Sequence, residues 1–121
     1  MSGEYPRSYR IADQIQRELS QLIRLEVKDP GLSPLLTVSA VDVTRDLSIA
    51  KIYVTVMDDA QRDSSLAALK RAGGFLRSQI ARRLTTRTVP ELRFYYDETA
   101  ERGERLSNLI DAAVRSDADN Q

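Results

Sequence analysis

The sequence of 121 residues contains no cysteine and no histidine. The first absence excludes disulfides, thiolate nucleophiles and cysteine-ligated metals, and the second removes the usual general base at neutral pH and the commonest metal ligand. No apolar run approaches the roughly 20 residues needed to span a bilayer, and the chain does not begin with the pattern of a signal peptide. We therefore expect a cytoplasmic, non-enzymatic protein without membrane contact, metal or cofactor.

Charge is balanced over the whole chain but not along it. The 18 basic residues equal the 18 acidic residues in number. Between Lys70 and Arg93, seven basic residues accompany one acid, Glu91, whereas seven acids and three arginines lie between Asp97 and the end. A segment of net charge +6 is thus followed by one of −4, and this asymmetry indicates a polyanionic partner for the basic segment.

The first half of the chain predicts one helix and two strands. Apolar residues recur at helical spacing over residues 9–27, and the breakers in "KDPG" at 28–31 end that pattern. Two runs rich in β-branched residues follow, at 35–43 and 47–56, and the linker "TRD" between them is short enough for a hairpin. The alternation changes phase in both runs, so we expect a bulge or burial on both faces.

The second half predicts a long helical stripe and one further strand. Apolar residues between 66 and 84 share one helical face, and Asp63 or Ser64 is a suitable cap for its start. Residues 91–96 alternate cleanly between apolar and polar side chains, which is typical of a strand with one buried face. A weaker helical pattern begins near Gly103.

This order predicts an α+β fold in which the helices pack on one face of a three-stranded sheet. The second and third strands are joined by a crossover through the long helix. We expect a single domain over residues 9–112, a flexible N-terminus at 1–8 and a flexible polar tail at 113–121.

The long helical stripe contains two adjacent glycines, Gly73 and Gly74, each costing about 1 kcal/mol relative to alanine in a helix interior. On a straight helix Phe75 would be exposed and Arg77 buried, and a bend at the glycines resets the phase. Close approach of the helix to the sheet explains Gly73 equally well, but Gly74 lies outside the stripe. We therefore expect two helices, with backbone N–H groups at the start of the second helix open to an anion.

Several strings resemble those of the ribosome-binding factor A family. They are "IQRELSQLIRLEVKDP", "VDVTRDLSIAKIYVTV", "RAGGFLRSQI", "RTVPELRFYYDET" and "GERLSNLID", and together they cover most of residues 9–111. That family has an Ala-x-Gly kink in place of the Gly-x-x-Gly loop of ordinary KH domains, and Ala72, Gly73 and Gly74 match it position by position.

The resemblance implies a type II KH-like domain with the order α-β-β-α-(kink)-α-β and a short C-terminal helix. It also implies a monomeric, non-catalytic factor that binds the 16S rRNA of the immature 30S subunit. Late maturation including 5′ end processing, a need at low temperature and release by a ribosome-associated GTPase follow from the same resemblance. Because Gly-x-x-Gly is missing, the backbone clamp of ordinary KH domains is not expected.

The predicted RNA contacts are the basic residues around the kink, with one further arginine in the hairpin turn. They are Lys70, Arg71, Arg77, Arg82, Arg83, Arg87 and Arg45. If about four of them neutralise phosphates, the logarithm of the affinity should fall with the logarithm of the salt concentration at a slope near −3. Tyr53, Tyr95 and Tyr96 are interpreted as packing residues.

Two other functions stay open on the sequence alone. The first is a protein-interaction module whose arginines dock an acidic protein surface. The second is a small hydrolase of phosphoester or acyl-phosphate substrates, which would use an arginine and the backbone amides at the kink.

Overall fold

The structure, a computed structural model, describes residues 6–84 and 86–99. Its elements in chain order are α1 (Arg7–Glu26), β1 (Thr37–Val43), β2 (Ile49–Thr55), a 3-10 turn η1 (Asp59–Gln61), α2 (Arg62–Arg71), α3 (Gly73–Arg83) and β3 (Glu91–Tyr96). The predicted C-terminal helix near Gly103 and the predicted tail at 113–121 lie outside the described residues, as does most of the predicted N-terminal segment.

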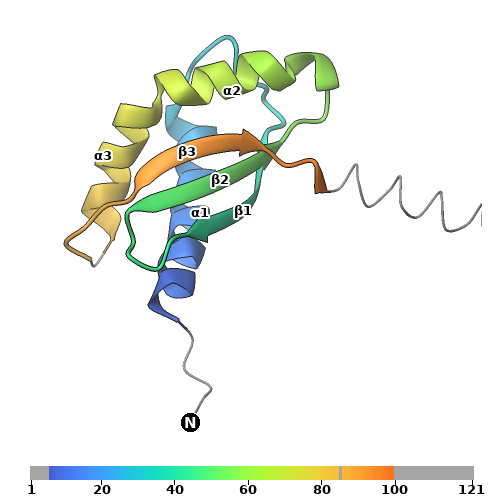
Figure 1. The fold of residues 1–121 in the computed structure, drawn as a ribbon. Helices are drawn as coiled ribbons and strands as arrows, with labels where there is room; N and C mark the ends of the chain where they lie inside the picture. Colours follow the sequence, from blue (N-terminus) through green and yellow to red (C-terminus); the bar gives the residue numbers. More distant parts are fainter. Residues whose placement is uncertain (1–5, 85, 100–121) are drawn as a thin grey trace, which may run out of the picture.

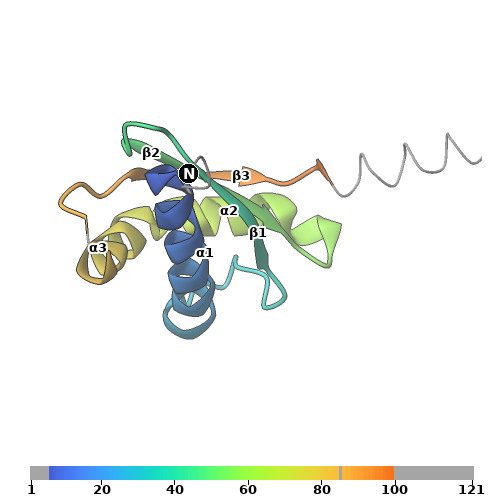
Figure 2. The same cartoon turned by 90° about the horizontal axis from the view of Figure 1, so that it is seen from below.

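The strands form one sheet in the order β1-β2-β3. β1 and β2 are antiparallel, whereas β3 is parallel to β2 and is reached through α2 and α3. Figures 1 and 2 show the three helices on the same side of the sheet. The α+β architecture predicted from the sequence is confirmed, including the crossover. Among the described residues, no helix combines the length and apolar character that crossing a bilayer requires.

The core lies between this helical side and one face of the sheet. α1 contributes an apolar stripe that includes the fully buried Ile15 and Leu19, and α3 contributes Leu76 and Ile80. The sheet contributes alternate side chains, which are Val38, Val43, Ala50, Ile52, Val54 and Phe94. The opposite face carries the polar members of each strand and has no helix against it within the described residues (Figure 2).

The "KDPG" segment ends α1 as predicted, because Val27 takes an extended conformation directly after the helix. The Asp29 carboxylate accepts a hydrogen bond of 2.9 Å from the Gly31 N–H, which makes a local turn. The same carboxylate accepts two hydrogen bonds from Arg71 at the end of α2. The loop is therefore fixed to the helix that leads into the kink.

Of the two explanations expected for the change of phase, a bulge or burial on both faces, the hairpin shows a bulge in β1, and it corrects the strand bounds. The register shifts between Val38 and Ala40, which accounts for the change of phase in β1. Leu47 and its neighbour Ser48, predicted to begin the second strand, instead belong to the turn, where Leu47 has a φ of 62°. A positive φ is strained for leucine, but the side chain is buried in the core. Its apolar character therefore reflects burial from a turn and not from a strand.

The predicted cap of the second helical segment is wrong. A short 3-10 turn precedes α2, and Asp58 caps that turn by accepting a hydrogen bond from the Ala60 N–H. Gln61 occupies the N-cap of α2 without a side-chain bond, so Asp63 and Ser64 lie inside the first turn. Asp63 still stabilises α2 from the first turn, since a negative charge at a helix N-terminus is favourable.

Candidate nucleic-acid interface

The long helical stripe is broken at Ala72, as the phase argument predicts. α2 ends at Arg71, Ala72 has φ −84° and ψ −2°, and α3 begins at Gly73. The Ala72 N–H still bonds to the carbonyl of Ala68. The two helices are thus joined by one residue, and Figure 1 shows the bend between them.

Neither glycine is required by contacts inside the described chain. A Cβ atom built on Gly73 or Gly74 would meet nothing within 4 Å, and neither residue has a positive φ. The close approach of Gly73 to the sheet, one of the two explanations the sequence left open, is therefore wrong. The glycines leave an open, side-chain-free surface at the start of α3.

The bend removes the predicted burial of Arg77 but not the predicted exposure of Phe75. Arg77 is exposed, as expected from a reset phase. Phe75, however, remains 45% exposed. The reason is that the buried side of α3 is occupied by Leu76 and Ile80, which leaves the preceding residue on the flank of the helix. An aromatic ring therefore lies beside the open glycine surface.

The start of α3 is a helix N-terminus without a side-chain cap. The first intrahelical bond runs from the Leu76 N–H to the Ala72 carbonyl, so the N–H groups of Gly73, Gly74 and Phe75 precede the helical ladder. Such a helix terminus favours a phosphate or another anion.

Two of the predicted contacts have carboxylate partners in the chain. Arg71 binds both oxygens of Asp29 at 3.0 Å, and Arg83 lies 3.2 Å from Glu18 on α1. The hydrogen bond from Arg71, together with that from the Gly31 N–H, holds the pKa of Asp29 below its ordinary value. These two arginines therefore act as links between elements, and their contact with RNA stays a prediction.

The Asp29 pair predicts a pH-dependent contribution to stability. A carboxyl group whose pKa is lowered on folding stabilises the fold above its unfolded pKa of 3.8, and this contribution is lost as the pH falls through the folded value. Asp29→Asn should therefore lower the melting temperature slightly at pH 7, and the gap to the parent protein should close below about pH 4. Asparagine keeps an acceptor for the Gly31 N–H, so the comparison isolates the charge. A gap that persists at pH 2.5 would contradict this assignment, and Arg71→Gln should reproduce the effect.

The other cations of the kink region carry no carboxylate partner among residues 6–84 and 86–99. Arg77 donates to the Val89 carbonyl at 2.9 Å, which holds its guanidinium beside the loop before β3. Lys70, Arg82 and Arg87 are exposed, and the described residues give none of them an ion pair. These three side chains are the ones most available to a phosphate.

A shallow hollow of about 320 Å³ lies between the kink and β3. It is lined by Lys70, Gly73, Leu92, Arg93, Phe94 and Tyr95. β3 is an edge strand, so the backbone groups of alternate residues on its outer side have no partner strand. Tyr95 is 40% exposed. The sequence showed the basic residue Arg93 but gave no signal that this strand meets the kink.

The hairpin turn lies at the same end of the sheet as the loop between α3 and β3. Ile49 pairs with Glu91, and the Glu91 N–H donates to the Ser48 carbonyl at 2.9 Å. The turn that carries Arg45 and the loop that carries Arg87 therefore lie at one end of the sheet, beside each other in Figure 1. The structure thus brings Arg45 toward the predicted contacts of α3.

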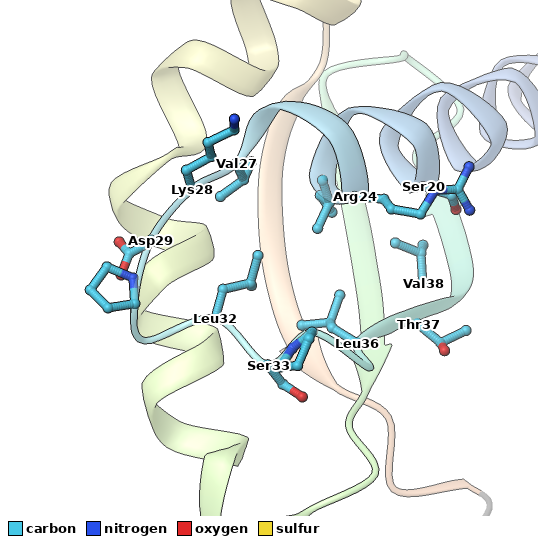
Figure 3. A pocket seen from close by; sticks show the side chains of 13 residues that line it. Ser20, Arg24, Val27, Lys28, Asp29, Leu32, Ser33, Leu36, Thr37 and Val38 are labelled. Carbon is cyan, nitrogen blue, oxygen red and sulfur yellow. The ribbon is translucent and has the colours of Figure 1, made fainter.

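A second hollow, of about 600 Å³, is separate from these residues. It lies between the end of α1, the "KDPG" loop and the start of β1 (Figure 3). Its lining includes the apolar side chains of Ile23, Leu32 and Val38 and the basic side chains of Arg24 and Lys28. None of the predicted RNA contacts lines it.

The described residues contain few groups suited to metal binding or to acid catalysis. No group of three or more His, Cys, Asp or Glu side chains among them could hold a metal ion. The pKa values of Asp29, Asp46 and Asp97 are all lowered by hydrogen bonds, from Arg71, Ser48 and Ser39 respectively. A general acid needs the opposite shift.

Three helices on one face of a three-stranded sheet, with a break between the second and third helix, define a KH-like domain. The model of the family "Ribosome-binding factor A" matches residues 7–110. The chain belongs to the ribosome-binding factor A family.

Similar proteins cover nearly the whole chain. Ribosome-binding factor A of Chromohalobacter salexigens is 55% identical over 117 residues, covering 94% of this chain and 88% of that protein. The crystal structure of the Thermus thermophilus factor has a TM-score of 0.65 and 34% identity, covering 74% of this chain and 94% of the other. A homology model of the Thermus thermophilus factor, fitted into a cryo-EM map of a 30S complex with that factor, has a TM-score of 0.63 and 32% identity, covering 76% and 96%.

Proposed function

We propose that this protein is a non-enzymatic assembly factor that binds the 16S rRNA of the immature 30S subunit through the kink region. The observation that carries the proposal is the group of exposed cations, Lys70, Arg82 and Arg87, without carboxylate partners in the described residues. Lys70 lies three residues before the open glycine surface at the N-terminus of α3, and Arg82 and Arg87 lie at the other end of that helix. A helix N-terminus and exposed cations along one helix suit a phosphate backbone. The 30S complex of the Thermus thermophilus factor supports the small subunit as the partner.

The proposed role is to hold immature rRNA in one conformation during late maturation, including processing of its 5′ end. A binding role needs no catalytic group, which agrees with the absence of histidine and cysteine from the sequence. Action as a monomer, a need at low temperature and release by a ribosome-associated GTPase belong to the same proposal.

Cosedimentation with small subunits tests this function. The protein should sediment with immature particles, and the binding should disappear after the particles are treated with RNase. The logarithm of the affinity should fall with the logarithm of the salt concentration at a slope near −3 if about four phosphates are neutralised. Binding that survives RNase treatment would favour the protein-interaction module instead. Chemical footprinting of the rRNA with and without the protein would then locate the contact.

A further inference from the structure

The hollow of about 600 Å³ at the end of α1 is an open apolar surface that the RNA contacts do not use (Figure 3). Val27, Leu32 and Leu36 line it, and all three are only half-buried although they pack against the core. The buried side chains of Ile23 and Val38 line it as well. Its volume is in the range of pockets that hold a ligand. The hollow therefore has room for several further apolar side chains.

The charged side chains that line this hollow leave it with a positive balance. Arg24 and Lys28 are exposed, and neither has an ion pair within residues 6–84 and 86–99. Asp29 also lines the hollow, but both oxygens of its carboxylate are bound by Arg71. The hollow therefore suits an amphipathic segment that has an apolar stripe and a net negative charge.

The sequence after β3 contains a segment of this kind. In residues 100–121, which lie outside the described residues, apolar side chains recur at the spacing i, i+3, i+4, i+7 and i+8 that is typical of one helix face. Five acids and three arginines give the same residues a net charge of −2. An amphipathic helix gains most of its stability by packing this face against the rest of a protein. The members of the stripe are Leu106, Leu109, Ile110, Ala113 and Val114.

The last described residues lie within reach of the hollow. The Asp97 carboxylate accepts a hydrogen bond of 2.6 Å from the Ser39 hydroxyl of β1, two residues after Thr37, which lines the hollow. The Thr99 N–H donates to the same carboxylate at 2.9 Å, so the chain is still at this end of the sheet at Thr99. Seven residues connect Thr99 to Leu106 and span up to about 23 Å when extended. The first and third strands of a sheet are only about 10 Å apart, so the segment can pass the end of the sheet and reach the hollow.

We propose that residues 106–114 pack into this hollow as an amphipathic helix in the free protein. Their apolar stripe then covers the half-buried side chains of the hollow, and Arg24 and Lys28 lie beside a segment of opposite net charge. The segment is favoured over a separate partner because its covalent connection gives it a high effective concentration at the hollow. This inference does not rest on the proposed function, since it concerns the protein without RNA.

A spin label on the segment tests the proposal in the full chain. Because the sequence contains no cysteine, Ser107→Cys provides a single attachment site for a nitroxide, beside the stripe and not on it. The nitroxide broadens the backbone amide signals of residues close to it in the spectrum of the isotope-labelled protein. The signals of Leu32 and Leu36 should lose most of their intensity. Those of Arg45 and Arg87, at the other end of the sheet, should keep theirs.

Two double variants of equal charge make the test specific to the stripe. Leu109→Asp/Ile110→Asp places two carboxylates on the stripe, so it should restore the signals of the hollow and lower the melting temperature by several degrees. Asn108→Asp/Ala112→Asp adds the same two charges on the other face of the expected helix. It should leave the broadening and the melting temperature close to those of the parent.

The proposal is overturned if the label broadens no signal around the hollow, or if both double variants restore these signals equally. A mixture of spin-labelled protein without isotopes and isotope-labelled protein without the spin label reports contacts between molecules. Packing within one chain gives no broadening in this mixture, whereas broadening of the hollow there means that a second copy is the occupant and overturns the proposal. Cosedimentation with small subunits tests the proposed function separately, because these spectra contain no RNA.

Discussion

Replacing Lys70, Arg82 and Arg87 together by glutamate should weaken binding to immature small subunits by about a hundredfold or more. Each phosphate contact that is lost costs roughly a factor of 5 to 8 at about 0.1 M salt, because counterions are no longer released, and reversal adds repulsion. The three side chains are exposed and have no ion pairs among the described residues, so the fold should not depend on them. Cosedimentation over a range of protein and salt concentrations measures the affinity and its slope.

The control for this variant is Arg83→Glu, which changes an arginine that has a carboxylate partner. Arg83 is left out of this variant because its guanidinium lies 3.2 Å from the Glu18 carboxylate. Arg83→Glu would therefore place two carboxylates beside each other. Arg83→Glu alone should therefore lower the melting temperature, whereas the triple variant should melt with the parent. An affinity within threefold of the parent, at an unchanged salt slope, would show that these cations do not meet phosphates and would remove the basis of the proposed function.

The regular elements could be predicted from the sequence wherever periodicity was undisturbed. β3 was predicted at 91–96 and is observed as Glu91–Tyr96, since its apolar and polar residues alternate without interruption. The break between α2 and α3 followed from a conflict between two helical phases. Leu47 shows the limit of this reasoning, because a buried leucine with positive φ in a turn has the same pattern as the first residue of a strand.

The charges of the interface were visible in the sequence, but their pairing was not. Arg71 and Asp29 are 42 residues apart and meet only because the loop after α1 folds against the end of α2. Arg83 and Glu18 meet only because α3 packs on α1. Composition counts all of these arginines equally, whereas the fold separates those that link elements from those that face solvent. The approach of β3 to the kink depends on the same tertiary packing.

Gly73→Ala/Gly74→Ala should have opposite effects on stability and on binding. Both glycines have ordinary helical geometry, and a Cβ at either position meets nothing within 4 Å. The substitution should therefore stabilise the fold by about 1 kcal/mol, mainly by reducing the entropy of the unfolded chain. This corresponds to a rise in melting temperature of about 4–8 °C for a domain of this size.

Binding to small subunits should nevertheless fall by about tenfold or more, because two methyl groups would stand in front of the first amides of α3 and hold a phosphate away. Ala67→Gly, at an exposed position of α2, is the matched control: it should lower the melting temperature by a similar amount and leave the affinity unchanged. A lower melting temperature of the double alanine variant would mean that the fold itself requires the glycines. A higher melting temperature with unchanged affinity would mean that nothing approaches the kink closely, since the open surface would then serve neither the fold nor a partner.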